Sequence, residues 1–246
     1  VIEVGQALAG PLAGAIMADM GADVIKVEKP DGGDDARMWG PPFVDESSMM
    51  FHSTNRNKRS VTIDIKSADD IEKLKLLVRD ADIMIQNLRP GIVEEIGIGP
   101  SVMCALYPRL VYCSIGAFGN KGPMRNAPGF DPLAQAYGAV MTLTGRPEDP
   151  PTFCAPAIND VATGMWSVIG ILAAMQERNR TGKGCTIDTS LFESAVHWAA
   201  GPLNNYHLSG KPPQRFGGAS ATLVPYQTFE TADGWLFIMC MTDRFW

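Results

Sequence analysis

The sequence lacks the short motifs that assign a metal site or a serine nucleophile. It has three histidines among 246 residues, none in an H-E-x-x-H pattern, which argues against a metal hydrolase. A G-x-S-x-G elbow is absent, which excludes a serine hydrolase of that type. The five cysteines form no C-x-x-C pair and indicate reduced thiols in a cytosolic protein rather than disulfides or a zinc site. The enzyme chemistry that remains depends on carboxylates.

Long apolar runs and an excess of positive charge are also missing. No run approaches the roughly 18 residues that a bilayer-spanning helix needs, and the longest, such as Val168–Met175, have only helix length. The chain carries 21 basic and 27 acidic residues, so its net charge of −6 disfavours a general nucleic-acid surface. Because 46% of the residues are apolar, a sizeable core can form. We therefore expect a cytoplasmic protein with no membrane or nucleic-acid partner.

The two ends of the sequence differ from ordinary chain termini. Val1 already lies within an apolar, strand-like run, and Trp246 follows closely on another such run at residues 235–241. No signal peptide pattern precedes the first run. We expect the sequence to be a fragment of a longer chain.

Alternating strand and helix patterns predict an α/β fold. Gly10-Pro11 opens one helix, and Ser67 with Asp70 fits the capping box of another. Strands are predicted at residues 1–4, 23–28, 61–65, 82–86, 110–114 and 186–189, and longer helices at residues 161–178 and 191–208. Strands that alternate with helices indicate a parallel sheet. We place a domain boundary near residue 205, which gives one domain over 1–205 and the start of a smaller one over 206–246.

The turn after the first predicted strand is rich in glycine but matches no phosphate-binding motif. Gly5, Gly10 and Gly14 have the spacing G-x4-G-x3-G, whereas a dinucleotide site uses G-x-G-x-x-G. The Lys-Ser/Thr pair of a P-loop is absent as well. Two interpretations stay open: a tight turn for helix packing, or a turn that approaches a ligand at the carboxyl ends of the strands.

Two segments combine asparagine with basic residues. Asn55–Ser60 is the densest basic cluster of an acidic chain, and Asn87–Gly91 repeats the combination of asparagine and arginine directly after a predicted strand. Both are either solvated loops or a site for a phosphate-bearing ligand, because guanidinium and amide donors match phosphate oxygens.

Asp160 stands at the start of the predicted helix over residues 161–178. An aspartate in this place is most often a helix N-cap. Residues 156–158 before it are Pro, Ala and Ile, and the small Gly164 follows one turn later. These neighbours would give a carboxylate unusually apolar surroundings, so a functional carboxylate is the second interpretation.

In their order along the chain, these motifs form a recognisable series. It consists of Leu8–Pro11, Gly21–Glu28, Asn55–Ser60, Asn87–Gly91, Gly129–Asp131, Asp160 with Gly164, Thr181–Gly184, and Pro225-Tyr226 with Asp233–Trp235. The series resembles the family III CoA-transferases, which include formyl-CoA transferase and carnitine CoA-transferase and share their fold with α-methylacyl-CoA racemase. The resemblance covers essentially the whole chain. It implies a Rossmann-like large domain with a parallel sheet, a smaller second domain, and an interlocked homodimer.

The resemblance also implies a set of site residues, each carried over by its place in a motif. Its catalytic residues are Asp160, as covalent nucleophile, and Gly217 with Gly218, as a mobile loop over it. Its CoA contacts are Leu8, Ala9, Lys29, Ile63, Asp64, Ile65, Lys66, Asn87, Leu88, Arg89, Pro128, Gly129, Phe130 and Asp131. Three positions depart from the family pattern: Lys29 replaces an arginine, Glu95 replaces a basic residue, and Ala219-Ser220 stands where many members have histidine.

The implied activity is transfer of CoA between an acyl-CoA thioester and a free carboxylic acid. The Asp160 carboxylate would attack the thioester carbonyl, which gives a mixed aspartyl anhydride and then an aspartyl-CoA thioester. Such an enzyme is a transferase of sulfur-containing groups. CoA is its substrate, and we expect no metal and no permanently bound cofactor.

Two other functions stay open. An acyl-CoA racemase moves a proton at the α-carbon and needs two acid–base groups. Racemases have a histidine where this chain has Phe130, which cannot carry a proton. The third possibility is a non-catalytic CoA-binding subunit, against which the presence of Asp160 argues.

Overall fold

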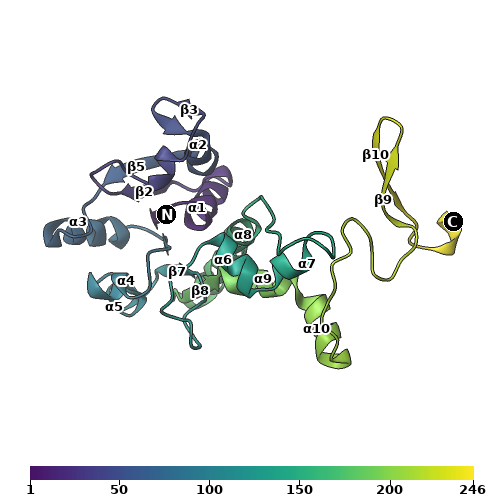
Figure 1. Ribbon diagram of the computed structural model, residues 1–246. Coiled ribbons are helices and arrows are strands. Elements are labelled where there is room, and N and C mark those ends of the chain that lie inside the picture. Colours follow the sequence, from purple (N-terminus) through teal and green to yellow (C-terminus); the bar gives the residue numbers. More distant parts are fainter. The chain divides into compact units, whose positions relative to one another are not determined.

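The computed structural model describes the whole sequence, residues 1–246, and Figure 1 labels its elements. The strands are β1 (Ile2–Val4), β2 (Val24–Glu28), β3 (Phe43–Val44), β4 (Ser47–Ser48), β5 (Lys58–Thr62), β6 (Ile83–Gln86), β7 (Val111–Gly116), β8 (Thr186–Ser190), β9 (Tyr226–Thr231) and β10 (Gly234–Met239). The helices are α1 (Ala9–Asp19), α2 (Met49–Asn55), α3 (Ala68–Arg79), α4 (Ile92–Glu95), α5 (Pro100–Leu106), α6 (Asp131–Tyr137), α7 (Val140–Leu143), α8 (Ile158–Thr181), α9 (Leu191–Trp198) and α10 (Ala200–Ser209), with short 3₁₀ helices η1 (Asp35–Met38) and η2 (Asp243–Phe245).

Six strands form one fully parallel sheet in the order β5-β2-β1-β6-β7-β8. The chain begins in the middle of the sheet with β1 and moves outward through β2 to β5. It then returns to place β6 on the other side of β1, with Val4 opposite Gln86. The direction of winding therefore reverses between β1 and β6. This is the strand order of a Rossmann fold, and it confirms the predicted α/β class with a parallel sheet.

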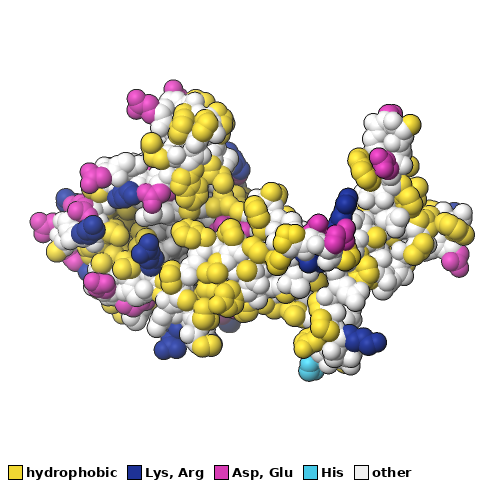
Figure 2. Space-filling view, in the orientation of Figure 1, with side chains coloured by type: hydrophobic (Ala, Val, Ile, Leu, Met, Phe, Trp, Pro, Cys, Tyr) yellow, Lys and Arg dark blue, Asp and Glu magenta, His cyan; other side chains and the backbone are white.

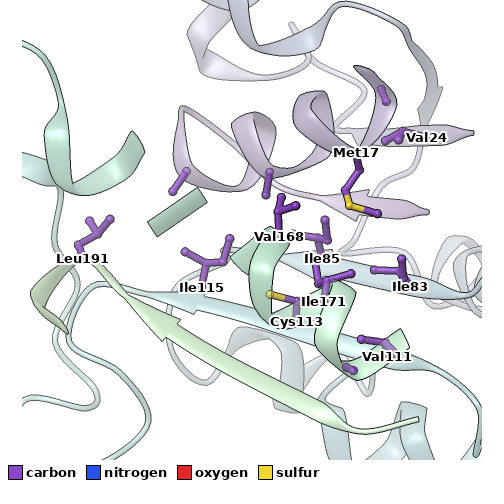
Figure 3. Close-up of a cluster of buried hydrophobic side chains, with 14 of the residues drawn as sticks. Met17, Val24, Ile83, Ile85, Val111, Cys113, Ile115, Val168, Ile171 and Leu191 are labelled. Atoms are coloured by element: carbon purple, nitrogen blue, oxygen red, sulfur yellow. The ribbon is translucent and has the colours of Figure 1, made fainter. Parts of the chain in front are cut away.

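Alternate residues of the central strands face two separate hydrophobic clusters. Ile83 and Ile85 of β6 belong to one cluster, whereas Met84 between them belongs to the other. Figure 3 shows the first cluster, in which side chains of α1 and α8 pack on the sheet. The second cluster joins the opposite face to α3, α4 and α5. Burial on both faces explains why the central strands are almost continuously apolar.

Most predicted strands agree with the structure to within two residues at each end, and three elements differ by more. Strand β5 covers Lys58–Thr62 rather than residues 61–65. It lies at an edge of the sheet and pairs only with β2, so polar side chains can face solvent along it. The predicted helix over 191–208 is split at Ala199, because Pro202 has no N–H and its ring would clash with the carbonyl of Trp198. Helix α8 is longer than predicted and begins three residues earlier than residue 161, at Ile158.

Helix α8 is long enough and apolar enough to cross a membrane, judged by length and composition alone. It contains no uninterrupted apolar run of that length, since uncharged polar residues such as Thr163 and Ser167 divide its sequence. In the structure one side of α8 is buried, with Val168 and Ile171 in the cluster of Figure 3. A helix that packs on an α/β sheet can thus meet the same criterion of length and apolar composition as a membrane span.

A second compact unit comprises residues 135–156 and 195–246, apart from the unit of residues 1–134 and 157–194 that holds the sheet. It contains α7, α10 and the antiparallel β9–β10 hairpin. The predicted domain boundary near residue 205 falls inside this second unit. The division of the protein into a domain over 1–205 and a second over 206–246 stays a prediction.

Four charged side chains are buried together beside the turn that follows β1. Lys26 contacts Glu3 and Asp34, each at 2.9 Å, and Lys58 contacts Glu3 at 2.6 Å. All four side chains are at most 2% exposed. Two positive and two negative charges balance, which offsets the cost of removing them from water. Burial would lower the pKa of Lys26, but the charges of Glu3 and Asp34 outweigh it and raise that pKa.

We predict that Glu3→Ala destabilises the protein strongly, because it leaves two lysines buried with one carboxylate. Breaking a buried ion pair from one side costs about 3–5 kcal/mol of unfolding free energy. Urea denaturation followed by circular dichroism measures the change. The control is Glu72→Ala, since the Glu72–Lys75 pair lies on the surface of α3 and its loss changes little. Equal stability of the two variants would contradict the prediction.

Candidate functional site

The carboxyl ends of the parallel strands gather most of the predicted CoA contacts at one edge of the sheet. Leu8 and Ala9 follow β1, Lys29 follows β2, residues 63–66 follow β5, and residues 87–89 follow β6. In open α/β sheets, ligands bind at this edge, where the winding direction reverses. Here the reversal lies between β1 and β6, so the turn after β1 and the segment after β6 flank the expected site.

The turn after β1 is held by Asn87, the first residue after β6. The side-chain oxygen of Asn87 accepts the backbone N–H of Gln6 at 2.8 Å, and its amide nitrogen donates to the carbonyl of the same residue at 2.8 Å. A β-carbon added to Gly10 would lie 3.1 Å from the amide carbon of Asn87. The glycine pattern of this turn therefore serves close packing, as one of the two sequence interpretations predicted.

Two further groups fix the turn from the side of β2. The Lys26 ammonium donates to the carbonyl of Gly5 at 2.8 Å, and a carboxylate oxygen of Asp34 accepts the N–H of Ala7 at 3.1 Å. Ala7 has a φ of 66°, in the left-handed region that residues with a side chain rarely occupy. Asp34 and Gln6 were absent from the predicted site, since their role depends on partners 27 and 81 residues away.

Asp160 lies in the first turn of α8 and is not its N-cap. The helix begins two residues earlier, at Ile158, and its N-cap residue Ala157 makes no side-chain capping bond. The capping oxygen comes from Asp131, which accepts the N–H groups of Asn159 at 2.7 Å and Asp160 at 3.1 Å. The capping interpretation of Asp160 is therefore wrong, because a more distant aspartate already caps α8.

The carboxylate of Asp160 instead faces the beginning of α1. It accepts a hydrogen bond from the backbone N–H of Ala9, the first residue of that helix. The N-cap residue Leu8 has no polar side chain to fill this place. Gly164, one turn along α8, lets the helices approach, since a β-carbon there would lie 3.0 Å from the carbonyl oxygen of Ala9. The N-terminus of a helix is a favourable place for a negative charge.

The pKa of Asp160 is raised to about 7. Burial is the largest cause, because it penalises the charged carboxylate, and the nearby negative charge of Asp131 adds to it. The hydrogen bond from Ala9 acts in the opposite direction and stabilises the ionised form. A carboxylate that is poorly solvated, yet ionised near neutral pH, is suited to nucleophilic attack.

The other predicted contacts after β7 divide into buried and exposed residues. Asp131 is buried against α8, as described, whereas Pro128 and Phe130 are exposed. A β-carbon on Gly129 would lie 3.0 Å from that of Ala117, so this glycine lets the loop pass close to the end of β7. The role of these four residues toward CoA stays a prediction.

The basic segment Asn55–Ser60 does not lie at the carboxyl edge of the sheet. It leads into the amino end of β5, where Arg59 pairs with Asp23 just before β2. Arg56 pairs with Asp19, and Lys58 points inward to Glu3. Internal acidic partners therefore neutralise this cluster. Arg89, at the carboxyl edge after β6, is exposed and forms no ion pair.

Gly217 and Gly218 belong to the second compact unit. Gly217 has a φ of 61°, and a β-carbon on Gly218 would lie 2.5 Å from the hydroxyl of Thr228, so the backbone needs both glycines here. The segment borders a surface hollow of about 370 Å³, also lined by Arg146 and Glu148. Its predicted place over Asp160 stays a prediction.

Comparison with known proteins places this chain in a family. The model of CoA-transferase family III matches residues 1–246. A succinate–glutarate CoA-transferase of Agrobacterium fabrum is 41% identical over 99% of this chain, which covers 62% of that protein. A succinyl-CoA:glutarate CoA-transferase of Mus musculus is 40% identical over 97% of this chain and 55% of its own length.

A solved structure agrees with these sequence matches. The crystal structure of a CAIB/BAIF family protein from Brucella suis has a TM-score of 0.91 and 42% identity, over 97% of this chain and 64% of that one. The chain thus spans less than two thirds of the length of these relatives. The family match nevertheless extends from the first residue to the last, and the chain belongs to CoA-transferase family III.

Proposed function

We propose that this protein transfers CoA between an acyl-CoA thioester and a free carboxylic acid, with Asp160 as the nucleophile. One observation carries the proposal: in a member of CoA-transferase family III, a half-buried carboxylate with a pKa near 7 lies at the N-terminus of α1, beside the switch point of the sheet. No structural reason for a helix cap remains at Asp160, because Asp131 fills that role.

In the proposed reaction, the Asp160 carboxylate forms a mixed anhydride with the donor acyl group, then a thioester with CoA, and then a mixed anhydride with the acceptor. An Asp160 oxygen attacks the thioester carbonyl carbon of the donor, the C–S bond breaks, and CoA thiolate leaves a mixed anhydride. The thiolate then attacks the Asp160 carbonyl carbon, which releases the donor acid and leaves an aspartyl-CoA thioester. The acceptor carboxylate attacks that thioester and expels the thiolate again. A final attack of the thiolate on the acceptor carbonyl forms the new acyl-CoA and restores Asp160.

Leaving-group chemistry and proximity both favour these steps. The thiol of CoA is a fair leaving group, since a thiol pKa is about 8.5. Holding the two reactants together contributes roughly 7–11 kcal/mol to the barrier reduction. The glycine loop at Gly217 and Gly218 is proposed to cover the intermediates.

We propose a short dicarboxylic acid as the acid substrate, and CoA as a substrate without any permanently bound cofactor. The names of similar proteins support the acid class, since they include glutarate, mesaconate and oxalate CoA-transferases. Racemisation at the α-carbon has less support, because Phe130 offers no proton beside Asp131. Cytoplasmic activity agrees with the five free cysteines.

We also propose that the protein acts as a homodimer. The outer face of α8 exposes Met165, Ile169 and Leu172, and all six residues of β10 are exposed. Figure 2 shows hydrophobic side chains gathered over the region of α6, α8 and α9. Exposed apolar surface of this extent is typical of a face that another chain covers.

Replacement of Asp160 by asparagine tests the proposed function. Asn keeps an oxygen for the Ala9 N–H but is useless as a nucleophile, so transfer between succinyl-CoA and glutarate should fall by several orders of magnitude. Hydroxylamine added to the wild type with acyl-CoA should leave a hydroxamate on the Asp160 peptide, found by mass spectrometry. Glu177→Gln, on the exposed side of the same helix, should transfer normally. Near-normal transfer by Asp160→Asn, or a label on Asp131, would refute the assignment.

The pH dependence of transfer provides a second test. Only ionised Asp160 attacks, so kcat/KM should fall as the pH drops below about 7. The pKa of Asp160 in the folded protein lies above the usual carboxyl value of 3.8, so the folded state binds this proton more tightly than the unfolded chain does. The free energy of unfolding therefore declines as the pH rises between these two pKa values. The Asp160→Asn variant has no carboxyl group here, so its stability should not show this decline with pH. Its melting temperature should exceed that of the wild type more at pH 8 than at pH 5, and an equal difference at both would contradict the raised pKa.

A third test concerns the position of CoA along the carboxyl edge of the sheet. Arg89→Ala should raise the CoA dissociation constant about tenfold or more, because a charge-assisted hydrogen bond to phosphate is lost. Arg59→Ala should leave it unchanged, since Arg59 pairs with Asp23 at the amino ends of the strands. Isothermal titration with CoA measures both. A larger effect of Arg59→Ala would place CoA at the other edge.

A further inference from the structure

We propose that Asn87 is a positioning residue that sets the Ala9 N–H on the carboxylate of Asp160, and not a side-chain contact of CoA. The inference rests on the proposed function, in which Asp160 is the nucleophile. Its evidence is a chain of contacts from the end of β6 through the turn after β1 to the start of α1. The parallel sheet already holds the ends of β1 and β6 in register.

The first of these contacts is the double hydrogen bond between Asn87 and Gln6. Both bonds measure 2.8 Å, and together they hold the N–H and the carbonyl of one residue. The preceding residues Val4 and Gln86 are partners in adjacent strands. Asn87 therefore reaches Gln6 from a rigid support, and its amide oxygen and nitrogen are both occupied by the turn. The turn uses one N–H donor and one lone pair of this amide, and these two bonds fix its orientation.

The second part is the path from Gln6 to Ala9. Ala7 occupies the left-handed region, which costs of order 1 kcal/mol or more for a residue with a side chain and persists only where its surroundings enforce it. Asn87 holds the residue before it, and Asp34 accepts the N–H of Ala7 itself. This conformation turns the chain from β1 into α1, so it also sets the direction of the Ala9 N–H.

The third part is the approach of α8 to this turn. Gly164 lies close to the carbonyl of Ala9, and Asp131 holds the N–H groups of residues 159 and 160. The backbone on the Asp160 side is thus fixed independently of Asn87. The position of the Ala9 N–H is the part of the contact that Asn87 controls. Loss of that hydrogen bond would disfavour the ionised carboxylate, since burial and Asp131 already oppose ionisation.

Kinetics and binding distinguish a positioning role of Asn87 from a role as a CoA ligand. In Asn87→Ala, the acidic limb of the kcat/KM profile should move up by about one pH unit, the size expected for one hydrogen bond to a carboxylate. The CoA dissociation constant should change less than about twofold. Gly10→Ala should shift the limb in the same direction by less, because its β-carbon presses on the Asn87 amide without removing it.

Gln86→Ala is the matched control. It removes the neighbouring amide, which bonds to Leu88 and Ser114 but not to the turn. The acidic limb of its kcat/KM profile should stay at the same pH as in the wild type. This should hold even if its melting temperature falls as far as that of Asn87→Ala. A shift equal to that of Asn87→Ala would reduce the effect to general destabilisation and overturn the inference.

A spectroscopic measurement separates this inference from the proposed function. In protein labelled with ¹⁵N-alanine, the Ala9 amide signal should titrate with Asp160 in the wild type and lose that titration in Asp160→Asn and in Asn87→Ala. This readout needs no transfer activity, so a wild type that fails to transfer CoA would refute the proposed function and leave the inference open to this test. A tenfold weaker CoA affinity in Asn87→Ala, with an unchanged acidic limb and Ala9 titration, would overturn the inference and make Asn87 a CoA ligand.

Discussion

Four hydrogen bonds to the turn between β1 and α1 hold the part of the structure on which the candidate site depends. Lys26 donates to the carbonyl of Gly5, and Asp34 accepts the N–H of Ala7. Asn87 both accepts the N–H of Gln6 and donates to its carbonyl. The turn lies where the winding of the sheet reverses, and each bond joins it to a residue that is distant in sequence. Without these bonds, the left-handed Ala7 would relax and α1 would start in another direction.

The same residues also belong to the stability of the fold. Lys26 binds the turn and at the same time neutralises Glu3 and Asp34 in the core. A buried charge network of this kind contributes little net stability compared with apolar packing, but it tolerates only one arrangement of its members. Burial lowers the pKa of Lys58, the outermost member, to about 8, although Glu3 opposes the shift. The network therefore couples the position of the turn to the integrity of β1, β2 and β5.

Asp160 is placed in an environment of opposing effects. Burial and the charge of Asp131 disfavour its ionisation, whereas the N–H of Ala9 at the start of α1 favours it. The balance leaves a carboxylate that ionises near neutral pH and is weakly solvated, which are the properties that covalent catalysis by a carboxylate requires. Asp131 has two effects at once, since it caps α8 and raises the pKa of its neighbour through one carboxylate.

Local patterns in the sequence determined the α/β class, the parallel sheet and the Ser67 cap of α3, because periodicity and capping depend on residues a few positions apart. The motif series also determined the family. The tertiary structure alone decided that Asp131 rather than Asp160 caps α8, that the basic cluster at Asn55–Ser60 is neutralised within the chain, and that Asn87 holds Gln6. These contacts join residues separated by 28 to 81 positions, and their partners meet only when the sheet and its helices are assembled.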